Sequence, residues 1–176
     1  MTIYHERQRL QFCLLHALNN LFQEPVFTRS SLNAVAENLL VDDPDDHGAM
    51  WSPLSQVFKT HHNLLTGNYD VNVLIAALEG KGVEVVWHDR RNETASIDLD
   101  KDDLFGMIIN ISVKKFAGLW KNRHWIAIKK IDEIWFNLDS SLNEPVKFEN
   151  NDEFRKFLDL SRSQGAELFL LTGQKD

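Results

Sequence analysis

Residues 123–140 read RHWIAIKKIDEIWFNLDS, and this stretch predicts a β-hairpin. Strand-like runs of β-branched, aromatic and other apolar residues lie on both sides of Asp132-Glu133, which we expect to be the two residues of a tight turn. A turn of that length pairs Ile131 with Ile134. The stretch therefore predicts two antiparallel strands near the middle of a sheet-forming half of the chain.

The register of this hairpin predicts that His124 and Asp139 lie close together. Stepping outward from the turn puts Ile126 opposite Asp139 and His124 opposite Ser141. Because side chains alternate between the two faces of a strand, His124 and Asp139 then share one face as diagonal neighbours, with about 7 Å between their backbones. The inference requires a regular turn, since a one-residue slip would move one side chain to the other face.

Outside the hairpin, helix signals come first in the chain and strand signals later. Leucines at helical spacing predict a helix over residues 13–22, which Pro25 ends. Further helices are expected at about 30–40, 52–58, 70–80 and 151–160, and strands at 83–87, 107–111 and 168–171. The expected caps are Ser30 or Ser31, Asp70, and Asn151 or Asp152. This order predicts an α+β fold with a largely antiparallel C-terminal sheet, and we expect residues 1–176 to form a single domain.

The composition limits the classes of function. The 176 residues carry 26 acidic and 19 basic side chains, and the formal net charge of −7 argues against nucleic acid and for a neutral or basic protein partner. No apolar stretch approaches the roughly 20 residues that span a bilayer, and the N-terminus lacks the form of a signal peptide. A single cysteine fits a reducing compartment. We expect a soluble intracellular protein, cytoplasmic or nuclear, and a monomer.

Cys13 is the only cysteine, so it is either a core residue or a reactive thiol. It opens the helix at 13–22, where free amide groups and the positive end of the helix dipole favour a thiolate. His124 can accept the thiol proton and later protonate a departing amine, while Asp139 can orient the ring. The Gln8 amide and the Cys13 backbone N–H can stabilise an oxyanion. Together these residues predict a thiol hydrolase without metal or cofactor.

Other interpretations of the same residue types remain open. Free cysteines are often buried in cores, so Cys13 alone would carry little information. His16 lies one helical turn from Cys13 and is a rival base, but it lacks an evident carboxylate partner, which favours a structural hydrogen bond. His88-Asp89 is a possible second dyad, although the end of a strand is the simpler interpretation.

The remaining candidate sites favour structural roles. His61-His62 suggests metal, but adjacent histidines point in different directions and a solvated loop is favoured. The acidic residues 42–46 lack the spacing and closing glutamate of a calcium loop. The tryptophans at 87, 120, 125 and 135 are expected to be mostly core, and Trp125 also to shield the dyad from water.

Five motifs, taken in order, carry a family resemblance. They are Tyr4-His5-Glu6-Arg7-Gln8, Cys13 with His16-Ala17-Leu18-Asn19-Asn20, Gly67-Asn68-Tyr69-Asp70-Val71, His124-Trp125, and Trp135-Phe136-Asn137-Leu138-Asp139-Ser140. This set resembles the Josephin domain, the papain-like cysteine protease module of a small deubiquitinase family. The match runs from about Tyr4 to Leu171, and it resembles the Josephin-only type, which lacks the ubiquitin-interacting tail of the ataxin type.

The resemblance implies cleavage of the bond after the C-terminal glycine of ubiquitin. It assigns the nucleophile to Cys13, the base to His124 and the oxyanion glutamine to Gln8. The third catalytic position is asparagine in the ataxin type and Asp139 here, as in the Josephin-only type. A carboxylate suits the role and is expected to change the pH profile.

The resemblance also concerns surfaces. Lys81 stands where the ataxin type has a tryptophan that belongs to a secondary ubiquitin contact, so that contact is not expected to carry over unchanged. The primary contact is expected on the helix face from Val71 to Leu74. Residues from about Ser30 to Phe58 are expected to form a helical arm over the cleft.

The function predicted from the sequence is a deubiquitinase that works through an acyl-enzyme on Cys13, with ubiquitin and ubiquitinated proteins as partners. An alternative keeps the fold and drops the chemistry, giving a ubiquitin-binding or adaptor module. A third reading is a thiol acyltransferase or a hydrolase for another ubiquitin-like modifier.

Overall fold

The computed structural model describes residues 2–8, 12–41, 62–63, 68–115 and 120–173. Within these residues, six strands form one antiparallel sheet in the order β3-β8-β4-β5-β6-β7. The strands are β3 (Glu84–His88), β4 (Leu104–Lys115), β5 (Trp120–Ile131), β6 (Ile134–Asn137), β7 (Val146–Lys147) and β8 (Glu167–Thr172), and β1 (His62–Asn63) pairs separately with β2 (Asn68–Tyr69). The α+β class expected from the sequence is confirmed.

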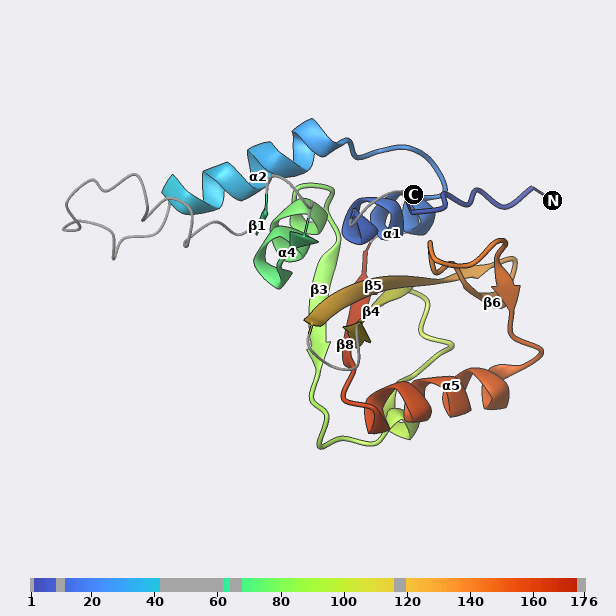
Figure 1. Ribbon diagram of the computed structural model, residues 1–176. Coiled ribbons are helices and arrows are strands. Elements are labelled where there is room, and N and C mark those ends of the chain that lie inside the picture. The colour runs from blue at the N-terminus through green and yellow to red at the C-terminus, as the bar shows by residue number, and fades with distance from the viewer. Residues whose placement is uncertain (1, 9–11, 42–61, 64–67, 116–119, 174–176) are drawn as a thin grey trace.

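Helices cover both faces of the sheet (Figure 1). On one face lie α1 (Cys13–Phe22) and α4 (Val71–Glu79), with α2 (Arg29–Val41) packed against α4. On the other face lie α5 (Asn151–Ser163) and the short 3-10 helix η2 (Thr94–Ser96). Among the described residues, no helix has the length and apolar character needed to cross a membrane.

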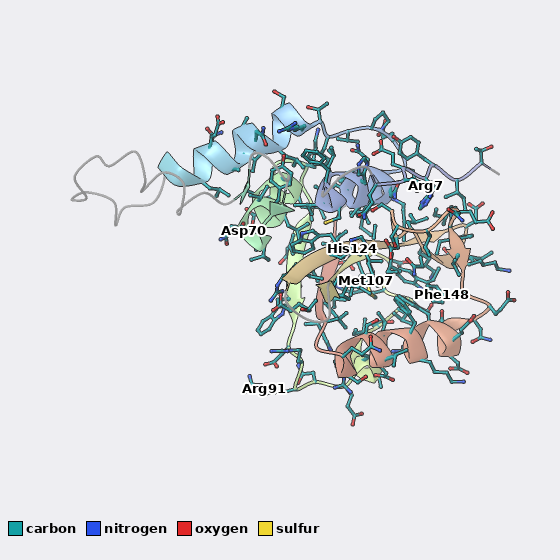
Figure 2. All side chains as sticks on the ribbon, viewed as in Figure 1. Arg7, Asp70, Arg91, Met107, His124 and Phe148 are labelled. Atoms are coloured by element: carbon teal, nitrogen blue, oxygen red, sulfur yellow. The ribbon has the colours of Figure 1, made fainter. Side chains whose placement is uncertain are left out.

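The alternation of side chains along the strands divides the core into two layers. In β4, Ile108 joins the layer under α1 and α4, while Met107 and Ile109 join the layer over α5. Figure 2 places Met107 and Phe148 between the sheet and α5, where the Phe148 ring lies 4.9 Å from that of Phe154. A sheet buried on both faces holds its strands at fixed positions, which is what a site built on β5 requires.

The hairpin has the predicted register. Asp132 and Glu133 have φ angles of 47° and 63°, the signature of a two-residue turn whose twist matches the strands. Ile131 pairs with Ile134, and the ladder continues to Ile128 opposite Asn137. One further hydrogen bond, from Leu138 N–H to Ala127 C=O at 2.8 Å, brings the chain to Asp139 in the expected register.

The helix boundaries agree with the sequence, with small shifts in the caps. The expected helix at 13–22 is α1, and the Asp70 carboxylate caps α4 by accepting two backbone N–H groups. The cap of α5 is Asn150 rather than the expected Asn151 or Asp152. For α2, Thr28 bonds to the Ser31 N–H, so the expected cap at Ser30 or Ser31 was wrong. The helix expected at 52–58 lies outside the described residues.

The expectation that the tryptophans are core residues was wrong for Trp87. Trp125 and Trp135 are each 2% exposed, whereas Trp87 is 54% exposed. Trp87 lies on β3, which is an edge strand of the six-stranded sheet, so no strand covers its outer side. The side chain of Trp120 lies outside the described residues.

Candidate active site

His124 and Asp139 form a buried hydrogen-bonded pair. His124 lies on β5, where that strand passes beneath α1 in Figure 2, and its Nε2 is 2.7 Å from Asp139 Oδ1. The loop after β6 fixes the carboxylate: Oδ1 accepts the Ser141 N–H at 2.8 Å, and the Asp139 N–H donates to Asn137 Oδ1 at 2.9 Å. The register of the hairpin therefore brings His124 and Asp139 together as predicted.

Cys13 is the first residue of α1 and is 4% exposed. Its Sγ is 3.9 Å from the backbone oxygen of Arg123, the residue before His124. The Cys13 thiol is also one of the groups that raise the pKa of the His124 ring. Neither a capping side chain at Phe12 nor an acidic residue in the first turn offsets the positive end of the helix dipole at this thiol.

The pair carries charge at neutral pH. Burial disfavours the charged His124 ring, but hydrogen bonds from the ring to Asp139 and Cys13 outweigh it and raise the pKa of His124 to about 9. Burial also opposes ionisation of Asp139, yet the hydrogen bond to His124 and the Ser141 N–H leave its pKa below the usual value. The site thus holds an imidazolium between a carboxylate and a thiol.

Gln8 lies beside this site through its backbone. Its N–H donates to the Ser140 C=O at 2.8 Å, next to Asp139. The side-chain Oε1 is buried and has no hydrogen-bond partner among the described residues. The structure thus brings Gln8 next to Asp139 through its backbone.

The sequence interpretation of His16 was wrong on one point, because His16 does have a carboxylate partner. Its Nδ1 is 2.6 Å from Glu6 Oε2. The same carboxylate accepts the Tyr4 hydroxyl and the Asn19 amide. Glu6 comes ten residues earlier in an irregular segment, so no periodicity pointed to the pairing.

The second suspected dyad does not form. Asp89 instead accepts both the side chain and the backbone N–H of Arg91, and the hydrogen bond to Arg91 lowers the pKa of Asp89 to about 2. His88 is buried, and its Nε2 has no hydrogen-bond partner in the part of the chain that the structure describes. Within the described parts of the chain, no group of three histidine, cysteine or acidic side chains is arranged to hold a metal ion. His61 and residues 42–46 lie outside the described residues.

The surfaces expected to contact a partner are partly core. Val73 and Leu74 on α4 are fully buried, so a partner on this helix would meet its neighbours, such as the exposed Asn72. The Lys81 ammonium lies 5.6 Å from the centroid of the Phe27 ring, a cation–π distance. Lys81, which follows α4, therefore contributes to holding Phe27, in the segment after α1, close to the end of α4.

Comparison with known proteins places this chain among the Josephin domains. The sequence pattern of the Josephin family matches residues 8–172. A Josephin-like protein of Arabidopsis thaliana is 58% identical over 163 residues, covering 92% of this chain and 45% of that protein. Human Josephin-2 is 37% identical over 180 residues, covering 99% of this chain and 88% of that protein. Human ataxin-3 is 26% identical, covering 98% of this chain and 46% of that protein.

These proteins define the class as a papain-like α+β domain, and the chain belongs to the Josephin family. It spans less than half the length of the Arabidopsis relative and most of the length of Josephin-2. Membership of a family that includes ataxin-3 supports a ubiquitin-related role.

Proposed function

We propose that this protein is a cysteine-type ubiquitinyl hydrolase, with Cys13 as nucleophile, His124 as acid and base, Asp139 as its orienting carboxylate and Gln8 as an oxyanion donor. The observation that carries the proposal is the 2.7 Å hydrogen bond between His124 and Asp139, with the Cys13 thiol 3.9 Å from the backbone oxygen of the residue before His124, at the uncapped end of a helix. Membership of the Josephin family supports ubiquitin as the partner.

In the proposed reaction, the Cys13 sulfur attacks the carbonyl carbon of the C-terminal glycine of ubiquitin. The carbonyl π electrons move to oxygen, and the Gln8 amide and the Cys13 N–H stabilise that charge. The charged His124 ring gives its proton to the departing lysine amine as the C–N bond breaks, which leaves a thioester. Water then adds to the thioester, His124 takes a proton from it, and the thiolate departs from free ubiquitin.

The protonation state supports this order of events. A raised His124 pKa means that the ring carries a proton at neutral pH. Asp139 stabilises the charged ring through the 2.7 Å bond. The acid needed by the leaving amine is therefore in place before substrate binds.

The test is the intact mass of the protein after incubation with ubiquitin that ends in an electrophile. We expect one covalent adduct in the wild type, none in Cys13→Ala, and slower adduct formation in His124→Ala. A folded wild type that forms no adduct but binds ubiquitin in an affinity measurement would support the binding-module alternative instead. Parallel probes built on other ubiquitin-like modifiers test the third reading.

A further inference from the structure

The side chain of Asn20 joins three separate segments of the chain. It is fully buried on α1, two helical turns after Cys13. Its Oδ1 accepts the Glu6 N–H at 2.5 Å, and its Nδ2 donates to the Glu6 C=O at 3.1 Å. The Nδ2 group also donates to the Leu138 C=O at 3.0 Å. An amide side chain offers two N–H donors, and both are used by these two carbonyl groups.

The two segments that Asn20 holds are those that carry the partners of Cys13. Glu6 lies two residues before Gln8, and Leu138 immediately precedes Asp139. The Gln8 N–H donates to the Ser140 C=O at 2.8 Å, so the two segments are also hydrogen-bonded directly to each other. One amide on the helix of the nucleophile therefore sets the position of both the oxyanion donor and the orienting carboxylate.

Asn19 provides a useful contrast because it is also a buried amide, at the adjacent position of α1. Its amide exchanges hydrogen bonds with the Phe27 backbone at 2.8 and 3.1 Å and reaches the Glu6 side chain. Among the described residues, no hydrogen bond of the Asn19 side chain goes to the segment that carries Asp139. The link across the site thus belongs to Asn20 specifically and is not a general property of buried amides on this helix.

Replacing Asn20 would remove the partner of three buried or partly buried backbone groups: the Glu6 N–H, the Glu6 C=O and the Leu138 C=O. Such groups are costly when left without partners, so the segments are expected to move until water or another group satisfies them. A displacement of about 1 Å in a catalytic group can lower a rate by roughly 100-fold. The consequence is a site whose members are all present but no longer aligned.

We propose that Asn20 is a positioning residue, which aligns Gln8 and the His124–Asp139 pair with Cys13 by bridging the backbone of Glu6 and Leu138. The inference rests on the proposed function for the roles of those residues, but the alignment itself can be measured without ubiquitin.

The test uses Asn20→Asp, which keeps the size of the side chain and the acceptor for the Glu6 N–H but replaces the two donors by an oxygen that faces two carbonyl groups. Two readouts follow the alignment: the alkylation rate of Cys13 by iodoacetamide across pH, and the NMR titration of the His124 ring. We expect alkylation at neutral pH to fall roughly 10- to 100-fold. We also expect the pKa of His124 to fall from about 9 toward its ordinary value of 6.5.

Thr94→Val is the matched control for a purely structural loss. Thr94 is buried on η2, on the opposite face of the sheet, and its hydroxyl donates to Asp159 at 2.5 Å. This variant should unfold at a lower temperature while keeping the wild-type alkylation profile and His124 titration. A folded Asn20→Asp protein with both readouts unchanged would overturn the proposal. Failure of the wild type to react with a ubiquitin probe would contradict only the proposed function, since neither readout uses ubiquitin.

If Asn20→Asp does not fold, hydrogen exchange in the wild type decides the question. The Glu6 N–H bonds to Asn20 Oδ1, the Gln8 N–H to the Ser140 C=O and the Ser141 N–H to Asp139 Oδ1, so these amides report on the two segments that Asn20 joins. We expect the three amides to have similar protection, because the bridge makes the segments open together. Protection of Glu6 and Gln8 that is about 100-fold weaker than that of Ser141 would show that the bridge does not hold them, contrary to the proposal.

Discussion

Two histidine–carboxylate pairs lie beside Cys13, and they differ in what each pair connects. His124–Asp139 and His16–Glu6 have similar lengths, 2.7 and 2.6 Å, and both histidine side chains are largely buried. The Cys13 thiol helps to raise the pKa of His124, while the Glu6 carboxylate is shared with a tyrosine and an asparagine. A short bond to a carboxylate therefore does not identify a catalytic base.

The difference follows from topology. His124 comes from a strand and meets Cys13 from outside its helix, so the ring can lie between thiol and carboxylate. His16 lies on the same helix as Cys13, one turn later, and its partner is on the segment that leads to Gln8. We infer that His124–Asp139 acts on the thiol and that His16–Glu6 anchors the N-terminal segment.

The largest expected effect separates the two histidines. His124→Asn removes the proton carrier and should lower the hydrolysis of a fluorogenic ubiquitin C-terminal amide by about 1,000-fold or more. His16→Asn should change that rate by less than about 10-fold, since its loss weakens an anchor and removes no reacting group. Steady-state kinetics at neutral pH give both numbers, and the reverse order of effects would exchange the two roles.

The two carboxylates give the next contrast. Asp139→Asn keeps the shape of the side chain but removes its charge, so the pKa of His124 should fall and the alkaline limb of the pH–rate profile should move to lower pH. We expect a loss of roughly 10- to 100-fold in rate, with activity retained because the ataxin type is expected to have asparagine there.

Glu6→Gln is the partner experiment, and it should affect folding more than chemistry. Loss of a charged acceptor with several donors is expected to cost about 1.5–3 kcal/mol of unfolding free energy. The pH–rate profile should keep its shape. If the alkaline limb shifted in Glu6→Gln and did not shift in Asp139→Asn, the assignment of Asp139 as the carboxylate that orients the catalytic histidine would be contradicted.

The stability of the fold should also depend on pH through His124. Its pKa is about 9 in the folded protein against an ordinary value of 6.5, so the folded state binds the proton more tightly. The contribution is fully present below pH 6.5 and is lost as pH rises through 9; at about 1.4 kcal/mol per pKa unit it is on the order of 3 kcal/mol. Denaturant unfolding across this range, compared with His124→Asn, measures it.

Lys129 gives a pH effect on stability of opposite sign to that of His124. Its ammonium donates to the Leu21 C=O at the end of α1 and lies 4.1 Å from the Phe105 ring centroid, but burial lowers its pKa from 10.5 to about 8. The unfolded state therefore binds more protons between these values, and stability should rise with pH there. Lys129→Met should remove that rise, so the His124 effect stands out more clearly in this background.

Local signals predicted the framework of the site well. The spacing of leucines predicted α1, and a two-residue turn with alternating flanks predicted the register that brings His124 to Asp139. Both depend on neighbours close in the sequence, which is why they could be inferred without coordinates. The antiparallel class followed from the same turn.

The contacts that hold the site together were not predicted, because they join distant parts of the chain. The Asn20 amide bonds to Leu138, 118 residues away, and in the sequence Asn20 stood out only as the last residue of the motif that begins with Cys13. The pairing of Glu6 with His16 was missed because the first segment has no periodicity. Trp87 was expected in the core because a sequence pattern does not reveal which strand lies at the edge.

The most direct test of the account is the cleavage of a ubiquitin–lysine isopeptide conjugate by the wild type and by Cys13→Ala, with thermal unfolding used to show that both are folded. We predict that the wild type releases free ubiquitin and that Cys13→Ala releases none. Equal release by the two proteins, or no release by a folded wild type that also fails to react with the electrophilic probe, would contradict the assignment of Cys13 as the nucleophile of a ubiquitin hydrolase.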